Sequence, residues 1–196
     1  MKKLILKTAL ITLAVFIAAV AGAYLMTALF APATLAEFYG KAGNYSLTVK
    51  YCERQYNKTG DFDDLIKLCS VLDEKRDAER TKKYVAEFTA NEKFAEYCEN
   101  SDEDSGKITT REFYNGKLVI AIFLTDGAAQ ASEAAANAVH EFGYTEYNPF
   151  YLLIIDCKDS FSESDGKVVS EAVSGLSAAA DETERAFLER DLELLK

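Results

Sequence analysis

The sequence predicts an all-α protein in which an N-terminal transmembrane helix is followed by short antiparallel helix pairs. Three observations lead to this fold class. The chain begins with one long apolar run that holds no acidic residue. Beyond this run the chain has few helix breakers, since its two prolines are Pro32 and Pro149. Apolar and small residues then recur at helical spacing, with a period of about 33 residues.

The apolar run from Thr8 to Ala31 predicts a membrane-spanning helix. Its 24 residues carry no charge. As a helix they would extend about 36 Å, which exceeds a hydrocarbon core of about 30 Å. We therefore expect an anchor in residues 1–31, with residues 8–31 in the membrane, and a separate domain in residues 32–196.

The orientation of this anchor follows from the lysines beside it. Lys2, Lys3 and Lys7 all precede the apolar run. Cytoplasmic flanks of membrane helices are enriched in lysine and arginine. We expect a cytoplasmic N-terminus and place residues 32–196 outside the cytoplasm.

A cleaved signal peptide is the alternative for this segment. Lys2 and Lys3 would form its charged region, Thr8–Val20 its apolar region, and Ala21-Gly22-Ala23 its small-residue cleavage pattern. Apolar residues continue past that pattern to Phe30, which favours an uncleaved span. Cleavage would instead make the protein secreted.

The domain expected in residues 32–196 is acidic. The whole chain carries a formal charge of −10, and this domain holds 32 acidic residues against 19 basic ones, or −13. Such a surface stays soluble and repels nucleic acid and anionic lipid headgroups. The composition therefore excludes nucleic acid as an expected partner.

The first part of this domain repeats with an offset of 33 residues. Leu35-Ala36 aligns with Leu68-Cys69, and the turn Gly43-Asn44-Tyr45 aligns with Arg76-Asp77-Ala78. Leu118-Val119 and the small residues after Asp126-Gly127-Ala128 repeat the same layout at an offset of 50. We place the extra residues of that longer interval at 99–106, and each unit reads as helix, turn and helix.

This layout resembles the tetratricopeptide repeat, which has a large–small pair, a large residue four positions later, a turn, and a small residue before an aromatic one. The repeats are degenerate, and the usual tryptophan and terminal proline positions are not filled. The resemblance implies a short solenoid of helix pairs whose first helices line a concave face. It also implies binding of a peptide or a partner protein.

Further helices are expected towards the C-terminus. Asn148 can cap a helix that begins at Pro149, so Phe150–Cys157 and 165–176 are predicted to form another pair. A last helix begins at Asp181, where Glu184 can complete a capping box. Its apolar residues recur at helical spacing, so we expect it to close the stack.

A β-hairpin is the alternative for the middle of the chain. Tyr114-Asn115-Gly116-Lys117 has the composition of a type I′ turn, between possible strands at 108–113 and 118–124. The hairpin would make the domain α/β. We favour helices because 118–124 is continuously apolar, whereas a two-faced strand alternates.

The four cysteines are Cys52, Cys69, Cys98 and Cys157. Four cysteines outside the cytoplasm permit two disulfides in three possible pairings. Their irregular spacing and their core positions in the repeat favour buried free thiols. The chain holds no CxxC pair, which argues against a zinc ribbon or a thioredoxin-type site.

Motifs that would carry catalysis, cofactor binding or metal binding are not found. His140 is the single histidine, and the chain lacks a phosphate-binding glycine loop and a nucleophile elbow. We therefore expect no enzyme and assign no catalytic, cofactor-binding or metal-binding residue. The candidate partner-binding residues are aromatic and lie on or near the expected first helices: Tyr39, Phe113, Tyr114, Tyr147 and Tyr151.

The sequence as a whole predicts a membrane-anchored extracytoplasmic interaction or scaffold module. A secreted binding protein is one alternative. The other is a structural subunit of a membrane complex, whose small residues at 18–23 would permit close helix packing.

Overall fold

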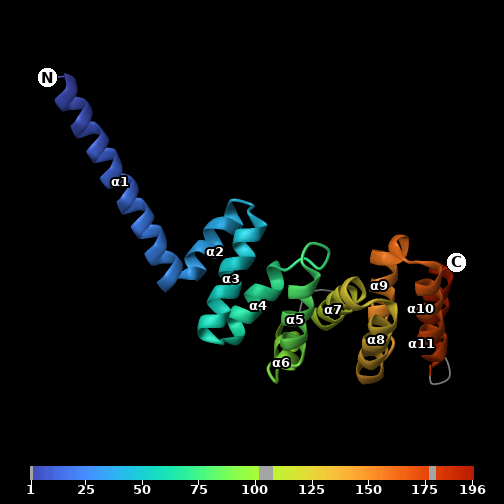
Figure 1. Ribbon diagram of the computed structural model, residues 1–196. Coiled ribbons are helices and arrows are strands. Elements are labelled where there is room, and N and C mark those ends of the chain that lie inside the picture. Colours follow the sequence, from blue (N-terminus) through green and yellow to red (C-terminus); the bar gives the residue numbers. More distant parts are fainter. Residues whose placement is uncertain (1, 102–107, 177–179) are drawn as a thin grey trace. The chain divides into compact units, whose positions relative to one another are not determined.

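The computed structural model describes residues 2–101, 108–176 and 180–196, and every regular element in these ranges is a helix (Figure 1). The all-α prediction is confirmed at this level. The α-helices are α1 (Lys2–Phe30), α2 (Pro32–Lys41), α3 (Tyr45–Thr59), α4 (Phe62–Val71), α5 (Ala78–Thr89), α6 (Phe94–Ser101), α7 (Thr110–Asp126), α8 (Ala128–Phe142), α9 (Pro149–Cys157), α10 (Glu163–Gly175) and α11 (Glu182–Leu194). A short 3-10 helix, η1 (Lys158–Ser160), follows α9.

The chain forms two compact units, which we call unit 1 (Met1–Val71) and unit 2 (Leu72–Lys196). The two units are separated where few contacts cross between residues. The predicted boundary between residues 1–31 and 32–196 instead marks where the chain leaves the membrane, and it stays a prediction.

α1 is long and apolar enough to cross a membrane. Its candidate span, Lys7–Phe30, is 24 residues long with a mean hydropathy of 2.3, and none of its best window is buried in the protein. A signal sequence near the N-terminus meets the same criteria. The anchor and the cleaved signal peptide therefore both stay predictions.

Unit 1 continues from α1 into three packed helices. α2 and α4 both pack on α3, and the core between them includes Val49, Leu65 and Leu68. The predicted turn before α3 is present, with the Asn44 side chain accepting a hydrogen bond from the backbone N–H of Leu47 at 3.2 Å. α3 ends at Gly60, whose φ of 63° suits a residue without a Cβ.

In unit 2 each of the helices α7 and α8 packs on a later helix. α7 packs on α5, α8 and α9, and α8 also packs on α10. α11 then packs against α9 and α10. A continuous apolar core joins α7, α8, α9, α10 and α11 and includes Val119, Ala135, Phe150, Leu153 and Val169.

The ends of the unit 2 helices follow from local hydrogen bonds. Asn148 caps α9 by accepting from the N–H groups of Phe150 and Tyr151, with Pro149 in the first turn as predicted. The predicted capping box of Asp181 and Glu184 is also confirmed at the start of α11. α10 covers Glu163–Gly175, close to the expected 165–176.

The helix favoured at Asn115-Gly116 is confirmed, and the alternative of a β-hairpin there is wrong. Both residues lie inside the continuous helix α7, which a capping box of Thr109 and Glu112 begins. Gly116 is buried, and a Cβ built on it would lie 2.3 Å from Leu152 Cδ1 on α9. The glycine therefore permits the close approach of two helices, whereas the turn interpretation treated it as a source of positive φ.

The net negative charge of the chain is confined to unit 2. Residues 72–196 contain 27 acidic and 14 basic residues, a formal −13, whereas residues 32–71 contain five of each. The acidity predicted for the whole domain from residue 32 onward thus belongs to unit 2. The part of unit 1 that follows the apolar helix is neutral and does not repel anionic surfaces.

All four cysteines are buried in the structure and none of them forms a disulfide, as expected for core thiols. Burial raises the pKa of Cys157 to about 11, with a further contribution from the nearby Asp156 carboxylate. Burial is also the main cause that raises the pKa of Cys52. These two thiols remain protonated at neutral pH, and the thiolate is the reactive form.

We predict that the native protein resists thiol alkylation at pH 7–8. Mass spectrometry after iodoacetamide treatment should find the four cysteines unmodified in the folded chain, because all are buried. In denaturant without reductant all four should be alkylated, because no disulfide protects them. Fewer than four adducts in denaturant would contradict the free-thiol arrangement.

Candidate partner-binding grooves

The five candidate aromatic residues do not form one surface. Tyr39 lies in unit 1 and stacks on Tyr51, with ring centroids 5.7 Å apart. Phe113 is 45% exposed on α7, while its neighbour Tyr114 is buried against Phe88, with centroids 4.8 Å apart. Tyr114 therefore belongs to the core and is inaccessible to a partner in this structure.

Tyr147 and Tyr151 do lie together. Their ring centroids are 6.0 Å apart, and both residues are partly exposed. The Arg190 guanidinium lies 3.9 Å from the centroid of the Tyr151 ring and also donates to the carbonyl oxygen of Glu146 at 2.7 Å. This pair of tyrosines is thus held in place by α11.

A groove between α7 and α9 is the main concave feature beside the candidate aromatics. We call it the α7–α9 groove, and its volume is about 200 Å³. It is lined by Glu74, Ile108, Phe113, Gly116, Lys117, Ile120, Leu152, Ile155 and Asp156. Apart from Glu74 and Ile108, these residues come from α7 and α9, which are the first helices of two predicted pairs.

Helical spacing places the apolar side chains of the groove. Phe113 and Ile120 are seven residues apart on α7, and Leu152 and Ile155 are three apart on α9, so each set shares one helix face. At Gly116 the two helices approach closely, because the Leu152 side chain packs where a Cβ would otherwise lie. Ile155 is 47% exposed, which leaves a large apolar surface at the groove open to a partner.

Charged groups lie at the edges of this apolar surface. Lys117 is only 7% exposed, and its ammonium lies 5.5 Å from the centroid of the Phe113 ring. Asp156 faces Lys75 at 3.6 Å, and both side chains are largely exposed. Such an exposed pair contributes little to stability and can exchange partners.

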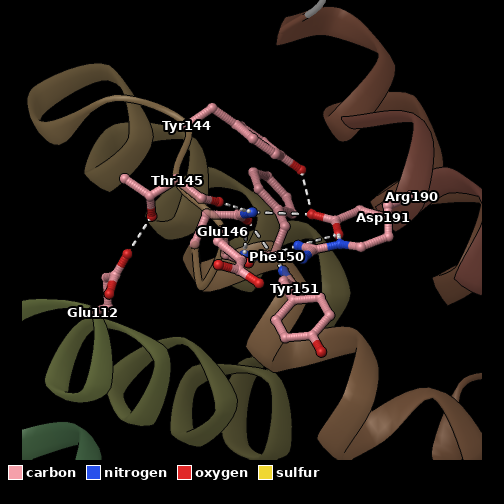
Figure 2. Close-up of polar contacts among 9 residues, drawn as sticks. Glu112, Tyr144, Thr145, Glu146, Phe150, Tyr151, Arg190 and Asp191 are labelled. Atoms are coloured by element: carbon pink, nitrogen blue, oxygen red, sulfur yellow. Dashed lines mark hydrogen bonds and ion pairs between the residues drawn. The ribbon is translucent and has the colours of Figure 1, made fainter. Parts of the chain in front are cut away.

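A second polar cluster joins α11 to the segment before α9 (Figure 2). Its central carboxylate has all its hydrogen-bond partners within the protein. The carboxylate of Asp191 is fully buried and accepts from Tyr144 Oη at 2.6 Å and from Asn148 Nδ2 at 3.0 Å. Arg190 Nε donates to the other carboxylate oxygen at 2.9 Å. Each oxygen of this buried carboxylate therefore has a partner, as a structural role requires.

Two further carboxylates hold the same segment. Glu112 accepts a hydrogen bond from the Thr145 hydroxyl (Figure 2). Glu184 accepts from the backbone N–H of Tyr144 at 3.1 Å. Burial and the adjacent Asp191 raise the pKa of Tyr144 well above its ordinary value, so its hydroxyl stays a donor. These contacts fix the start of α9, and with it one wall of the α7–α9 groove.

Sequence reasoning missed this cluster, although one signal for it existed. Asp191 stands three residues after Leu188 and four before Leu195, on the apolar face of the last helix. An acidic residue at such a position indicates a buried charge that needs partners. The pattern does not say which residues supply them.

Unit 1 has a larger groove of about 350 Å³ between α2, α3 and α4. Its walls include the small residues Ala33, Ala36 and Gly40. Asp64, which also lines it, already accepts from Thr59 at 2.7 Å and from Gln55 at 3.0 Å.

The charge of Asp64 in this groove is also stabilised by its neighbours. Burial pushes the pKa of the Asp64 carboxyl upward, but the hydrogen bonds from Thr59 and Gln55 outweigh burial and lower it. The carboxylate is thus stabilised within the protein. The groove lacks the large exposed apolar side chains that the α7–α9 groove offers.

The remaining residues considered in the sequence are the histidine, the cysteines and the possible metal ligands. His140 is exposed on the last turn of α8, while the cysteines are buried. Within the described residues, no group of three or more His, Cys, Asp and Glu side chains could hold a metal ion. Most of the extra segment expected at 99–106 lies outside the described residues.

Comparisons with protein-family models, with curated proteins and with solved structures find no match to this chain. The grooves themselves therefore carry the functional inference.

Proposed function

We propose that this protein is a single-pass membrane protein that presents a helical interaction domain outside the cytoplasm and binds a segment of a partner protein in the α7–α9 groove. The observation that carries this proposal is the apolar groove between two adjacent helices, with Phe113 and Ile155 exposed in it. Exposed apolar surface with a charged rim is typical of binding sites.

The chemistry of the groove indicates the kind of segment it binds. The groove is lined by apolar side chains and by the carboxylates of Glu74 and Asp156. Unit 2 has a formal charge of −13, which attracts positive partners over several ångströms. We propose a partner segment with apolar anchors flanked by lysine or arginine.

The helix packing of unit 2 supports a repeat architecture for this domain. α7 packs on α8 and on α9, while α8 packs on α10, so first helices meet first helices and second helices meet second helices. Such contacts from α7 to α9 and from α8 to α10 are what the resemblance to tetratricopeptide repeats implies between successive pairs. We propose that these pairs form a short solenoid whose concave side includes the α7–α9 groove.

A secreted form is the second candidate, and one observation favours it. Tyr24 and Ala28 follow the possible cleavage pattern in the sequence. The hydroxyl of Tyr24 shares a hydrogen bond with that of Tyr51 in unit 1, and Ala28 is only 5% exposed. After cleavage at Ala23, these two residues would still pack against unit 1, so the new N-terminus would not be an exposed apolar segment. The mass of the mature protein distinguishes a tethered domain from a released one.

Photocrosslinking tests the groove. A photoreactive phenylalanine analogue at position 113 or 155 of the full chain, in its native membrane, should form one common adduct with a partner protein. The matched control is position 124 on α7, because Leu124 is an exposed apolar residue (43%) outside the groove. We expect no such adduct there.

A competing peptide completes this test. A synthetic peptide with apolar anchors and flanking lysines should reduce the adduct at 113 and 155, and an acidic peptide of equal apolarity should not. Equal adducts from all three positions, or no adduct from the two groove positions, would contradict the proposed function.

A further inference from the structure

Two hydrogen bonds attach helix α3 of unit 1 to the end of the apolar helix α1. The phenol hydroxyls of Tyr24 and Tyr51 share a hydrogen bond of 2.5 Å. Further along both helices, Lys58 Nζ donates to the main-chain carbonyl oxygen of Phe30 at 2.8 Å. Ala28, between these two contacts on α1, is buried. α3 thus lies against one side of the last two turns of α1.

These contacts show that α3 runs in the same direction as α1. The pair Tyr24–Tyr51 comes first along both helices, and the pair Phe30–Lys58 follows six residues later on α1 and seven later on α3. The first turns of α3 therefore extend from Tyr51 back towards the middle of α1. From Tyr45, where α3 begins, to Tyr51 is about 9 Å of helix. At a crossing angle of about 50° this is still about 6 Å along α1.

A membrane-spanning α1 would place the first turns of α3 inside the hydrocarbon. About 20 helical residues cross a hydrocarbon core, and counting from Lys7 places its outer edge near Met26. Tyr24, and with it Tyr51, then lies just inside that edge. The turn 42–44 and the start of α3 lie about 6–9 Å deeper.

This part of unit 1 is too polar for hydrocarbon. The three residues of the turn, which include Asn44, are exposed, and so are Lys41 and Lys50. Irregular backbone that faces lipid has no water to satisfy its hydrogen bonds, and a lysine in the hydrocarbon is costly. A shift of the span does not remove the conflict. A span from Lys2 to residue 19 would contain three lysines and cover about 27 Å, less than the hydrocarbon core of about 30 Å.

Lipid also covers more of the end of α1 than α3 does. We call residues 24–30 the outer segment of α1. Leu25, Met26, Leu29 and Phe30 are each more than half exposed in the structure. In a bilayer these side chains lie in the hydrocarbon or at its boundary, where they leave water. Against this, α3 contributes the two hydrogen bonds and the burial of an alanine, so insertion is favoured over the contacts with α3.

Ala31, between α1 and α2, provides a hinge. Its φ of −137° and ψ of 58° are not helical, and Pro32 follows it as the first residue of α2. Because proline has no backbone N–H, it cannot continue the hydrogen bonds of α1 into α2. A change of the backbone angles at Ala31 turns α2 and α3 together away from α1.

We propose that unit 1 and the bilayer compete for the outer segment of α1. When α1 lies outside a bilayer, this segment packs on α3 as in the structure. When α1 spans a bilayer, lipid replaces α3, the Tyr24–Tyr51 and Phe30–Lys58 contacts break, and α2 to α4 turn about Ala31 away from the membrane. This inference rests on the membrane anchor of the proposed function and does not involve the α7–α9 groove. Insertion of the anchor thus uncovers the side of α3 that holds Tyr51.

Tryptophan fluorescence tests this competition, because the natural chain contains no tryptophan. Three full-length variants are reconstituted in phosphatidylcholine vesicles that contain lipid brominated on its acyl chains. Met26→Trp reports the depth of α1, while Ser46→Trp and Asn57→Trp lie about 16 Å apart near the two ends of α3. All three positions are exposed, so no substitution removes a core contact. If α3 stayed packed on an inserted α1, position 46 would lie in lipid and position 57 would lie outside it.

We expect Ser46→Trp and Asn57→Trp to share a water-like emission. Met26→Trp should emit at shorter wavelength, with quenching at least about twofold stronger, since only α1 reaches the hydrocarbon. Flotation of the vesicles after an alkaline wash reports the anchor separately. A protein that floats while positions 46 and 26 are quenched equally overturns this inference alone. A protein that does not float overturns the anchor, and this inference with it.

Discussion

Replacement of Asp191 by alanine is expected to destabilise unit 2 by about 3–5 kcal/mol, the usual cost of removing one partner from a buried ion pair. The carboxylate is fully buried and accepts from Tyr144, Asn148 and Arg190. The alanine variant leaves all three donors without this acceptor. A buried donor without a partner costs more free energy than its hydrogen bond contributed.

The measurement is unfolding of the full-length protein in detergent, combined with hydrogen exchange of residues 143–157 and 182–194. Exchange should accelerate most in these two segments, because Asp191 joins them. Glu189→Ala is the matched control, since Glu189 is exposed on the same helix, and it should shift stability by less than about 0.5 kcal/mol. Similar effects of the two substitutions would contradict the structural role of Asp191.

The conservative variant Asp191→Asn separates charge from shape. Its amide oxygen can still accept hydrogen bonds, but its NH2 group faces the donors of Asn148 or Arg190. We expect a loss between those of the alanine variant and the surface control. A loss equal to that of alanine would show that the charge, and not the packing, stabilises this cluster.

Helix ends in this chain could be predicted from the sequence because their causes are local. Asn148-Pro149 and Asp181 with Glu184 begin helices through hydrogen bonds within three residues of the chain. The apolar run of α1 was visible for the same reason, since length and hydropathy need no tertiary information. The apolar helix, the turns and the all-helical class therefore follow from short segments.

The candidate site could be predicted only in part, because it depends on which helix faces meet. Phe113 and Tyr114 are neighbours in sequence, but consecutive residues on a helix point about 100° apart. One is exposed at the groove and the other is buried against Phe88. Nothing in the local sequence distinguishes them until the partners of α7 are known.

The buried cluster around Asp191 shows the same limit over a longer separation. Its donors Tyr144 and Asn148 lie 47 and 43 residues away in the chain. Composition indicates that an acid on an apolar face needs partners, yet their identity is set by how α11 packs on α9.

The same tertiary dependence explains why a hairpin at Asn115-Gly116 was an alternative in the sequence, and it provides the last prediction. Gly116→Val should destabilise unit 2 by about 1–3 kcal/mol, the range found for overpacked cores. A Cβ at this position would lie 2.3 Å from Leu152 Cδ1 and 3.0 Å from Leu152 Cβ. The leucine tip can rotate, but its Cβ is fixed to α9, so α7 and α9 must separate.

A double-mutant cycle with Leu152→Ala tests this contact, because shortening Leu152 removes Cδ1, the nearest atom that the new side chain meets. The double variant should be more stable than the sum of the two single losses predicts, with a coupling of about 0.5–3 kcal/mol. Gly166→Val is the matched control, since a Cβ at Gly166 on α10 meets nothing within 4 Å. Equal losses at both glycines, with additive behaviour at Leu152, would mean that helix propensity alone governs position 116. The coupling predicted here would instead establish that this glycine sets the separation of the two helices, and so the width of the α7–α9 groove in which the partner is proposed to bind.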